Sequence, residues 1–219
     1  MKNFLMDHYY LAAVCVILFG IWILLVWCGR KLQAKEVVVL ASFSGIAVVS
    51  RIAFFWAPQW KPMTALIFTC GSIFGPMSGM LTGILSAFLS NFIFGQGPWT
   101  PFQMLGMGLV GLIGGFLQTD RKWLASVVCF LTVLCLYGPI VNFASYLMMN
   151  QGMNWQGFWI IELSGLPFDL IHAISTVVFL FFIWNPMRGK LMRLKTKYRI
   201  LQHRNLRRRL LKELEKGNY

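Results

Sequence analysis

The chain consists of long apolar runs separated by short polar or glycine-proline breaks. A run of about 20 apolar residues is long enough to cross a bilayer as a helix. The pattern predicts seven membrane-spanning helices, at residues 9–28, 37–58, 63–74, 77–94, 101–117, 123–149 and 166–184. A kink is expected at Gly138-Pro139 because proline interrupts helical hydrogen bonding. The predicted fold class is therefore an all-α polytopic membrane protein.

Composition narrows the function classes. Of the 219 residues, 58% are hydrophobic and 12% are charged, whereas soluble domains usually carry roughly 25% charged residues. This excludes an enzyme built on a water-soluble nucleotide-binding fold. The chain contains no G-x-x-x-x-G-K-[ST] motif, so any ATP must be bound by another protein. The five cysteines are scattered without metal-ligand spacing, which indicates buried hydrophobic residues.

The net charge of +13 is concentrated near the C-terminus, where 12 of the 20 Lys and Arg residues follow Pro186. Because cytoplasmic segments of membrane proteins are enriched in Lys and Arg, we expect the N-terminus outside and the C-terminus in the cytoplasm. The tail, residues 186–219, has leucines at helical spacing between arginines. This pattern predicts a basic amphipathic helix on anionic lipid headgroups, in preference to a nucleic-acid-binding segment.

Small residues recur at helical spacing in two places. Glycines occur at positions 71, 75, 79 and 83, and Pro76 predicts two helices that meet at a tight turn. Ordinary helix packing explains most such stripes, because small residues allow close backbone approach in lipid. Ala41 and Gly45 form another small pair, beside Ser42 and Ser44, and are a candidate docking face for a second membrane protein.

Polar groups within the spans are costly and therefore indicate functional sites. Arg51 lies about 10 Å below the expected outer boundary, where it either extends to the surface or pairs with Glu162 or Asp169. Asp169 and His172 share one helical face, which favours a hydrogen-bonded pair; two ligands alone do not make a metal site. Further hydrogen-bonding side chains near the outer ends of the spans, interleaved with aromatic residues, predict a small-molecule cavity open to the outside. They are Asn91, Gln96, Thr100, Gln103, Asn142, Tyr146 and Asn150.

Three stretches carry a resemblance to a known family. Residues 73–83 read Ile-Phe-Gly-Pro with further glycines at 79 and 83, and residues 95–104 read Gly-Gln-Gly-Pro-Trp-Thr-Pro-Phe-Gln-Met. Residues 166–173 contain Leu-Pro-x-Asp-x-x-His-Ala. The chain resembles the substrate-binding S component of energy-coupling factor (ECF) vitamin transporters over residues 37–185, which would form a six-helix membrane core. Residues 1–36, with an extra helix, and the tail 186–219 are additions to that core.

The resemblance implies a transport subunit and not an enzyme, with no cofactor, metal or catalytic residue. It would capture a vitamin-like compound outside the cell, and the Gly-Pro-Trp-Thr-Pro stretch is similar to that of a subgroup with cobalamin-type substrates. An integral coupling protein and two cytoplasmic ATPases would drive transport. Ala41 and Gly45 stand at the positions of the family's A-x-x-x-A docking motif, which is altered here because glycine replaces the second alanine. The candidate substrate-binding residues are Arg51, Asn91, Gln96, Trp99, Thr100, Gln103, Asn142, Tyr146, Glu162, Asp169 and His172.

Two other classes compete with this interpretation. A self-sufficient ion-coupled transporter usually shows broken helices at mid-membrane, whereas the polar groups here gather near the outer ends of the spans. An intramembrane metal-dependent or acid–base enzyme would use Glu162, Asp169 and His172. Against it, the sequence contains no H-E-x-x-H motif, and His172 is the only histidine in the predicted spans.

Overall fold

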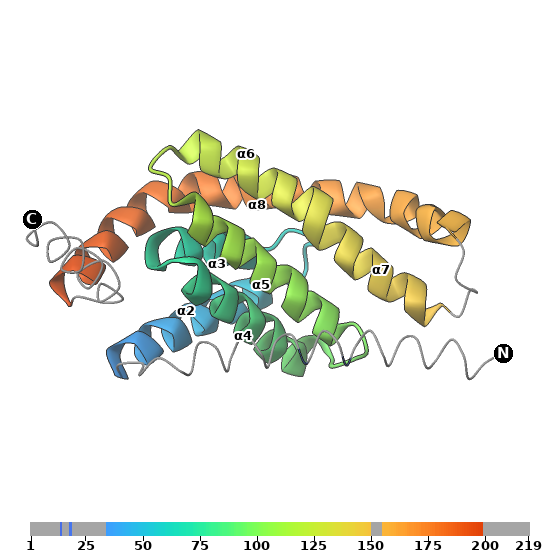
Figure 1. Cartoon of the computed structure of the whole chain (residues 1–219), viewed down its shortest axis with the longest axis horizontal. Helices are drawn as coiled ribbons and strands as arrows, with labels where there is room; N and C mark the ends of the chain where they lie inside the picture. Colours follow the sequence, from blue (N-terminus) through green and yellow to red (C-terminus); the bar gives the residue numbers. More distant parts are fainter. Residues whose placement is uncertain (1–13, 15–17, 19–33, 150–154, 199–219) are drawn as a thin grey trace, which may run out of the picture.

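The structure is a computed structural model that describes residues 14, 18, 34–149 and 155–198. Within these residues the regular elements are all helical (Figure 1). They are α2 (Ala34–Ala53), α3 (Met63–Phe74), α4 (Pro76–Phe94), α5 (Thr100–Leu117), α6 (Lys122–Thr132), the π-helical turn η1 (Val133–Tyr137), α7 (Gly138–Met148) and α8 (Trp155–Lys197). Because α6, η1 and α7 form one continuous segment, the bundle has five helices long and apolar enough to cross a membrane, plus the shorter α3.

The predicted all-α membrane fold with a six-helix core is confirmed. The predicted first span, residues 9–28, lies outside the described residues except for Val14 and Leu18. The prediction of a last helix at 166–184 is wrong, because α8 is one helix of 43 residues that contains both Pro167 and Pro186. Neighbouring helices can compensate for a proline inside a spanning helix. The proposed boundary between core and tail at residue 186 therefore falls within a helix.

The twelve residues of α3 are all buried, so this helix forms the centre of the bundle. At 1.5 Å per residue α3 is about 18 Å long, whereas the 18 residues of α5 extend for about 27 Å. The difference leaves room at one end of the bundle, where residues 54–62 connect α2 to α3. We call this end, which also holds the α4–α5 connection, the pocket end, and the opposite end, where α8 finishes, the tail end.

Backbone-to-backbone packing holds α3, α4 and α5 together. The predicted turn between α3 and α4 is confirmed at Gly75, whose φ of 105° is accessible mainly to glycine. A Cβ atom on Gly71, Gly79 or Gly111 would run into backbone atoms of a facing helix. The glycine stripe of α4 is therefore an internal packing surface, as close approach between small residues predicts.

The last turns of α8 cover the tail ends of α2 and α3. Figure 1 shows the C-terminal part of α8 turned toward α2. Leu191 packs in a cluster with Phe43 and Phe74. Arg188 donates hydrogen bonds to Ser72 and pairs with Asp120, and Lys195 donates to the backbone carbonyl of Ile73. The contacts of Arg188 and Lys195 are long-range, so they fix the end of α8 against the rest of the bundle.

Candidate functional site

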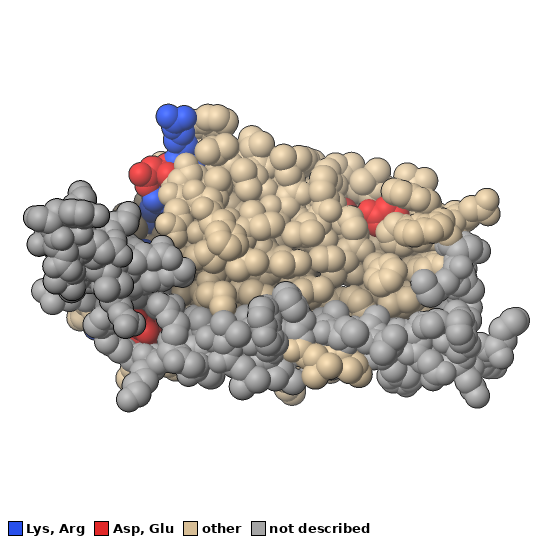
Figure 2. All heavy atoms as spheres, in the orientation of Figure 1, with Lys and Arg blue, Asp and Glu red and all other residues tan. Residues whose placement is uncertain are grey.

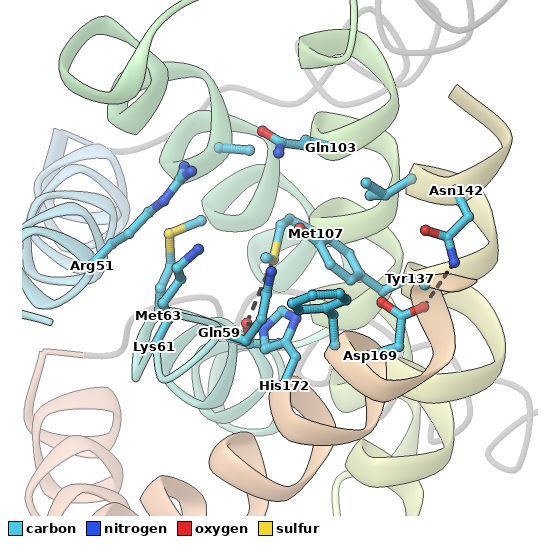
Figure 3. A pocket seen from close by; sticks show the side chains of 15 residues that line it. Arg51, Gln59, Lys61, Met63, Gln103, Met107, Tyr137, Asn142, Asp169 and His172 are labelled. Atoms are coloured by element: carbon cyan, nitrogen blue, oxygen red, sulfur yellow. Dashed lines mark hydrogen bonds between the residues drawn. The ribbon is translucent and has the colours of Figure 1, made fainter. Parts of the chain in front are cut away.

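A cavity of about 260 Å³ lies at the pocket end, in the space above the start of α3 (Figure 3). Its lining comes from α2, residues 54–62, α3, α4, α5, η1, α7 and α8. Met63 and Met107 provide apolar surface, and Arg51 and Asp169 lie toward opposite sides of the view in Figure 3. Nine of the fifteen lining residues have polar or ionisable side chains, and convergent polar groups beside apolar surface are a feature of small-molecule sites.

Arg51 is held in place by side chains of α4. Its Nη1 donates hydrogen bonds to Ser90 Oγ and to Asn91 Oδ1, the latter at 3.0 Å, and its guanidinium lies 4.5 Å from the centre of the Phe94 ring. Asn91 Nδ2 in turn donates to Gln103 Oε1 at 2.9 Å. The expected pairing of Arg51 with Glu162 or Asp169 is not formed among the described residues. Neutral oxygens hold the guanidinium instead.

The α4–α5 connection and the first residue of α5 contain three predicted site residues that do not line the cavity. Thr100 Oγ1 donates to Gln96 Oε1 at 3.0 Å, accepts from Asn91 Nδ2 at 3.1 Å and accepts from the Gly97 backbone N–H at 3.2 Å. The Trp99 ring lies against Gly97. Gln96, Trp99 and Thr100 therefore shape the start of α5, and Thr100 reaches Arg51 only through Asn91.

Lys61 adds a second cation to the lining, on the segment between α2 and α3. Ser175 Oγ donates to the Gln59 carbonyl at 2.9 Å, and the Trp60 ring lies 6.1 Å from the Phe179 ring, so α8 holds this segment. Lys61 Nζ has no hydrogen bond to any described residue. Burial, with a smaller contribution from the positive charge of Arg51, lowers the pKa of Lys61 to about 8.

An acidic group lies on α8 and is bridged by an amide of α7. Asn142 Nδ2 donates to Asp169 Oδ2 at 2.8 Å and to Glu162 Oε2 at 3.1 Å. Two glycines make this arrangement possible, because a Cβ on Gly138 would collide with the Asp169 carboxyl and one on Gly165 with the Asn142 amide. Close contact between α7 and α8 thus places two carboxylates around one amide.

His172 is part of the cavity wall and does not pair with Asp169, contrary to the expected pair. Its Nε2 lies 2.9 Å from Thr64 Oγ1, and its ring makes an edge contact with the Tyr137 ring at 5.1 Å between centroids. Within the part of the chain that the structure describes, no three His, Cys, Asp or Glu residues could jointly hold a metal ion.

Tyr137 reaches the cavity because the helix changes register beside it. It is the last residue of the π-helical turn η1, directly before Gly138-Pro139. A π-helical turn inserts an extra residue into a helix and often occurs at functional sites. The kink expected at Gly138-Pro139 stays a prediction, and the structure has a π-helical turn directly before that position. Gly106 leaves the space that the Tyr137 ring fills.

The structure brings five of the eleven candidate residues to the lining: Arg51, Gln103, Asn142, Asp169 and His172. The other six, Asn91, Gln96, Trp99, Thr100, Tyr146 and Glu162, lie outside it. Tyr146 packs against the Phe158 ring at 6.0 Å. Sequence reasoning missed the remaining lining residues, which are Gln59, Lys61, Met63, Thr64, Ala87, Met107, Tyr137, Val141, Gly165 and Phe168. Two signals in the sequence could have indicated lining residues: the Gly-Pro step after Tyr137 and the isolated charge of Lys61.

Ala41 and Gly45 lie on the exposed face of α2. A Cβ atom on Gly45 would meet no atom within 4 Å. Exposed Val38 and Val49 continue the same face. This small-residue pair, unlike the glycines of α4, therefore has no packing partner among the described residues.

Comparison with known proteins agrees with this architecture. The family model for the ECF-type riboflavin transporter, S component, matches residues 31–188. The matched region contains all six described spanning segments except the end of α8, and it contains every lining residue of the cavity. No curated protein matches the chain. Since the match covers well over half of the sequence, the chain belongs to the family of S components of ECF-type riboflavin transporters.

Proposed function

We propose that this chain captures riboflavin, or a flat vitamin of similar size, in the cavity at the pocket end and delivers it for import. The observation that carries the proposal is the cavity itself, which lies inside the family-matched region and combines apolar surface with polar side chains, among them Arg51, whose buried Nε has no hydrogen-bond partner in the described structure. Tyr137 and Phe168 contribute aromatic rings to its lining, which suits a planar ring system.

The size of the cavity favours a flavin over a cobalamin-type substrate. Its volume of about 260 Å³ lies just below the range of roughly 300–1,000 Å³ that is usual for ligand pockets. A corrinoid is several times larger than a flavin, so it would require the cavity to widen greatly. The test is a titration of the detergent-purified chain with riboflavin, in which binding is measured as quenching of riboflavin fluorescence. Cyanocobalamin is added as a competitor. Saturable binding of riboflavin is expected. Displacement of the bound riboflavin by cyanocobalamin would contradict the proposal.

We further propose that the pocket end faces the outside of the cell. Of the ten Lys and Arg residues in the described part of the chain, Arg51 and Lys61 line the cavity and the other eight gather at the tail end: Lys35, Arg121, Lys122, Arg188, Lys190, Arg193, Lys195 and Lys197. On the face shown in Figure 2, Lys and Arg appear only at that end of the described surface. The positive-inside rule supports this orientation. Exposed Lys190, Arg193 and Lys197 would then reach anionic lipid headgroups at the cytoplasmic surface.

We propose that the energy for import comes from partner proteins, namely an integral coupling protein and two ATPases. The sequence contains no phosphate-binding loop that could bind ATP. The exposed pair Ala41 and Gly45 on α2 would contact the coupling protein, since small residues permit close helix approach.

The chain alone is expected to bind riboflavin without accumulating it. Liposomes that contain only this protein should therefore show no ATP-driven or ion-gradient-driven uptake of radiolabelled riboflavin. Liposomes that also contain the coupling protein and ATPases are the positive control. Concentrative uptake by the single chain would contradict the assignment and favour an ion-coupled transporter.

Riboflavin affinity is expected to fall as the pH rises through about 8. The Lys61 ammonium can donate a charge-assisted hydrogen bond to a ligand carbonyl, and its pKa of about 8 means that the charge is lost above that pH. Ligand binding to the charged form raises this pKa, so affinity is highest below pH 8. A hydrogen bond from the charged ammonium is stronger than one from the neutral amine, and this corresponds to riboflavin affinity about fivefold higher at pH 7 than at pH 9.5. Lys61→Gln should remove this dependence; an unchanged pH profile in that variant would contradict it.

A further inference from the structure

The cavity is electrically asymmetric. Arg51 and Lys61 belong to α2 and the segment that follows it, whereas Asp169 belongs to α8 and is joined through Asn142 to Glu162. Figure 3 shows Arg51 and Lys61 on one side of the cavity, with Asp169 and Asn142 on the other. No ion pair connects the two sides within the described residues. A ligand in this space therefore meets cations at one end and carboxylates at the other.

Both ends keep hydrogen-bonding capacity that the protein does not use. Arg51 bonds to α4 only through Nη1, and its Nε is buried without a partner. Among the described residues, Lys61 Nζ donates no hydrogen bond and Asp169 Oδ1 accepts none, since Asn142 donates to Oδ2. Of these atoms Arg51 Nε is fully buried, and buried polar groups are normally satisfied. The cavity therefore suits a ligand that places hydrogen-bond acceptors at the end with Arg51 and Lys61 and hydrogen-bond donors at the end with Asp169.

We propose that the cavity binds its flavin in a single direction, with the two carbonyls of the pyrimidinedione edge against Arg51 and Lys61 and the ribityl hydroxyls toward Asp169 and Asn142. This proposal rests on the proposed function. The carbonyl oxygens accept hydrogen bonds and carry partial negative charge, which suits a guanidinium and an ammonium. The hydroxyls donate to the Asp169 carboxylate. Met107 and Tyr137 lie between the two ends, where the apolar part of the ring would be.

The direction of binding determines specificity against phosphorylated flavins. Riboflavin 5′-phosphate carries its phosphate at the end of the ribityl chain, so the proposed direction places a dianion beside Asp169 and Glu162. Like charges brought together in an enclosed site strongly oppose binding. The opposite direction would place the phosphate against Arg51 and Lys61 and make the phosphorylated form the better ligand. The two directions therefore predict opposite orders of affinity.

The experiment compares three flavins on the full-length protein in detergent: riboflavin, riboflavin 5′-phosphate and lumiflavin, which lacks the hydroxylated chain. In the unmodified protein, riboflavin 5′-phosphate should bind at least about 100-fold more weakly than riboflavin. Asp169→Asn should narrow this gap about tenfold and leave lumiflavin affinity nearly unchanged. Lys61→Gln should weaken lumiflavin and riboflavin by a similar factor. Asp120→Asn, which removes an exposed carboxylate at the tail end, is the matched control and should change none of these affinities.

The outcomes separate the direction of binding from the proposed function. If riboflavin binds but its 5′-phosphate binds equally well or better, the direction is overturned and flavin capture stands. If none of the three flavins binds the unmodified protein, both proposals are overturned. The ratio of the two affinities in the unmodified protein decides the direction even if a variant fails to fold. The proposed direction would also be overturned if Asp169→Asn changed the affinity for lumiflavin as strongly as the affinity for riboflavin.

Discussion

Tryptophan at Ala41 or Gly45 is expected to abolish riboflavin uptake by the assembled transporter while riboflavin binding by the chain alone stays within about twofold. Both positions are exposed on α2, and Gly45 has open space around it, so the larger side chain does not disturb the bundle. Ala41 is ten residues before Arg51, which is about 15 Å along the helix. Bulk at this position would therefore keep a partner helix away without reaching the cavity.

The measurement is a pull-down of the coupling protein beside a riboflavin titration on the same variant. Val127→Trp is the matched control, because Val127 is 49% exposed on α6, away from α2. It should leave both assembly and uptake intact. Loss of riboflavin binding together with loss of assembly would show that the α2 face packs within this protein. Normal assembly of the Ala41 and Gly45 variants would place the docking face elsewhere.

Gly111→Leu is expected to prevent folding of the bundle, whereas Gly45→Leu should be tolerated. The Cβ atom of any side chain at position 111 would collide with the backbone of Gly79 on α4. Backbone cannot move aside as a flexible side chain can. Overpacking against side chains costs about 1–3 kcal/mol, and a clash with backbone costs more. We expect Gly111→Leu to be recovered in much lower yield and as aggregate on size-exclusion chromatography.

Gly45→Leu is the control for Gly111→Leu. It has the same effect on helix propensity and hydrophobicity but does not disturb packing, so a difference between the two variants reports packing. Gly45→Leu should elute as the unmodified protein does, with a thermal midpoint that is equal or higher, because leucine favours helix over glycine. If both variants fold equally well, α4 and α5 are not in backbone contact at Gly111.

Local patterns in the sequence were enough to predict most of the fold. Apolar runs locate the spanning helices because a bilayer imposes the same length and composition on each of them. Gly75-Pro76 locates the break between α3 and α4, since one residue supplies the unusual φ and the other cannot continue the previous helix. The extent of α8 was missed because its polar-aromatic first turns are stabilised by packing against α7, which the sequence of α8 alone does not show.

The partners within the site could not be predicted from the sequence for a related reason. Opposite charge suggested Glu162 or Asp169 as the partner of Arg51, but tertiary structure places Ser90 and Asn91 beside it instead. Tyr137 enters the lining through a shift of helix register that no periodic pattern reveals. Residue types near the pocket end were predictable; which of them face one another depends on long-range packing.

The glycine contacts of α3, α4 and α5 restrict how this protein can change shape. Where backbone meets backbone, sliding one helix by a residue would replace a hydrogen atom with a side chain at Gly79 or Gly111, so no neighbouring register is sterically available. Three helices interlocked in this way translate and rotate as one body. Any rearrangement that admits or releases a vitamin must therefore move α2, α7, α8 or residues 54–62 against that body. The backbone that carries the lining residues Ala87, Gln103 and Met107 belongs to that body and would move with it.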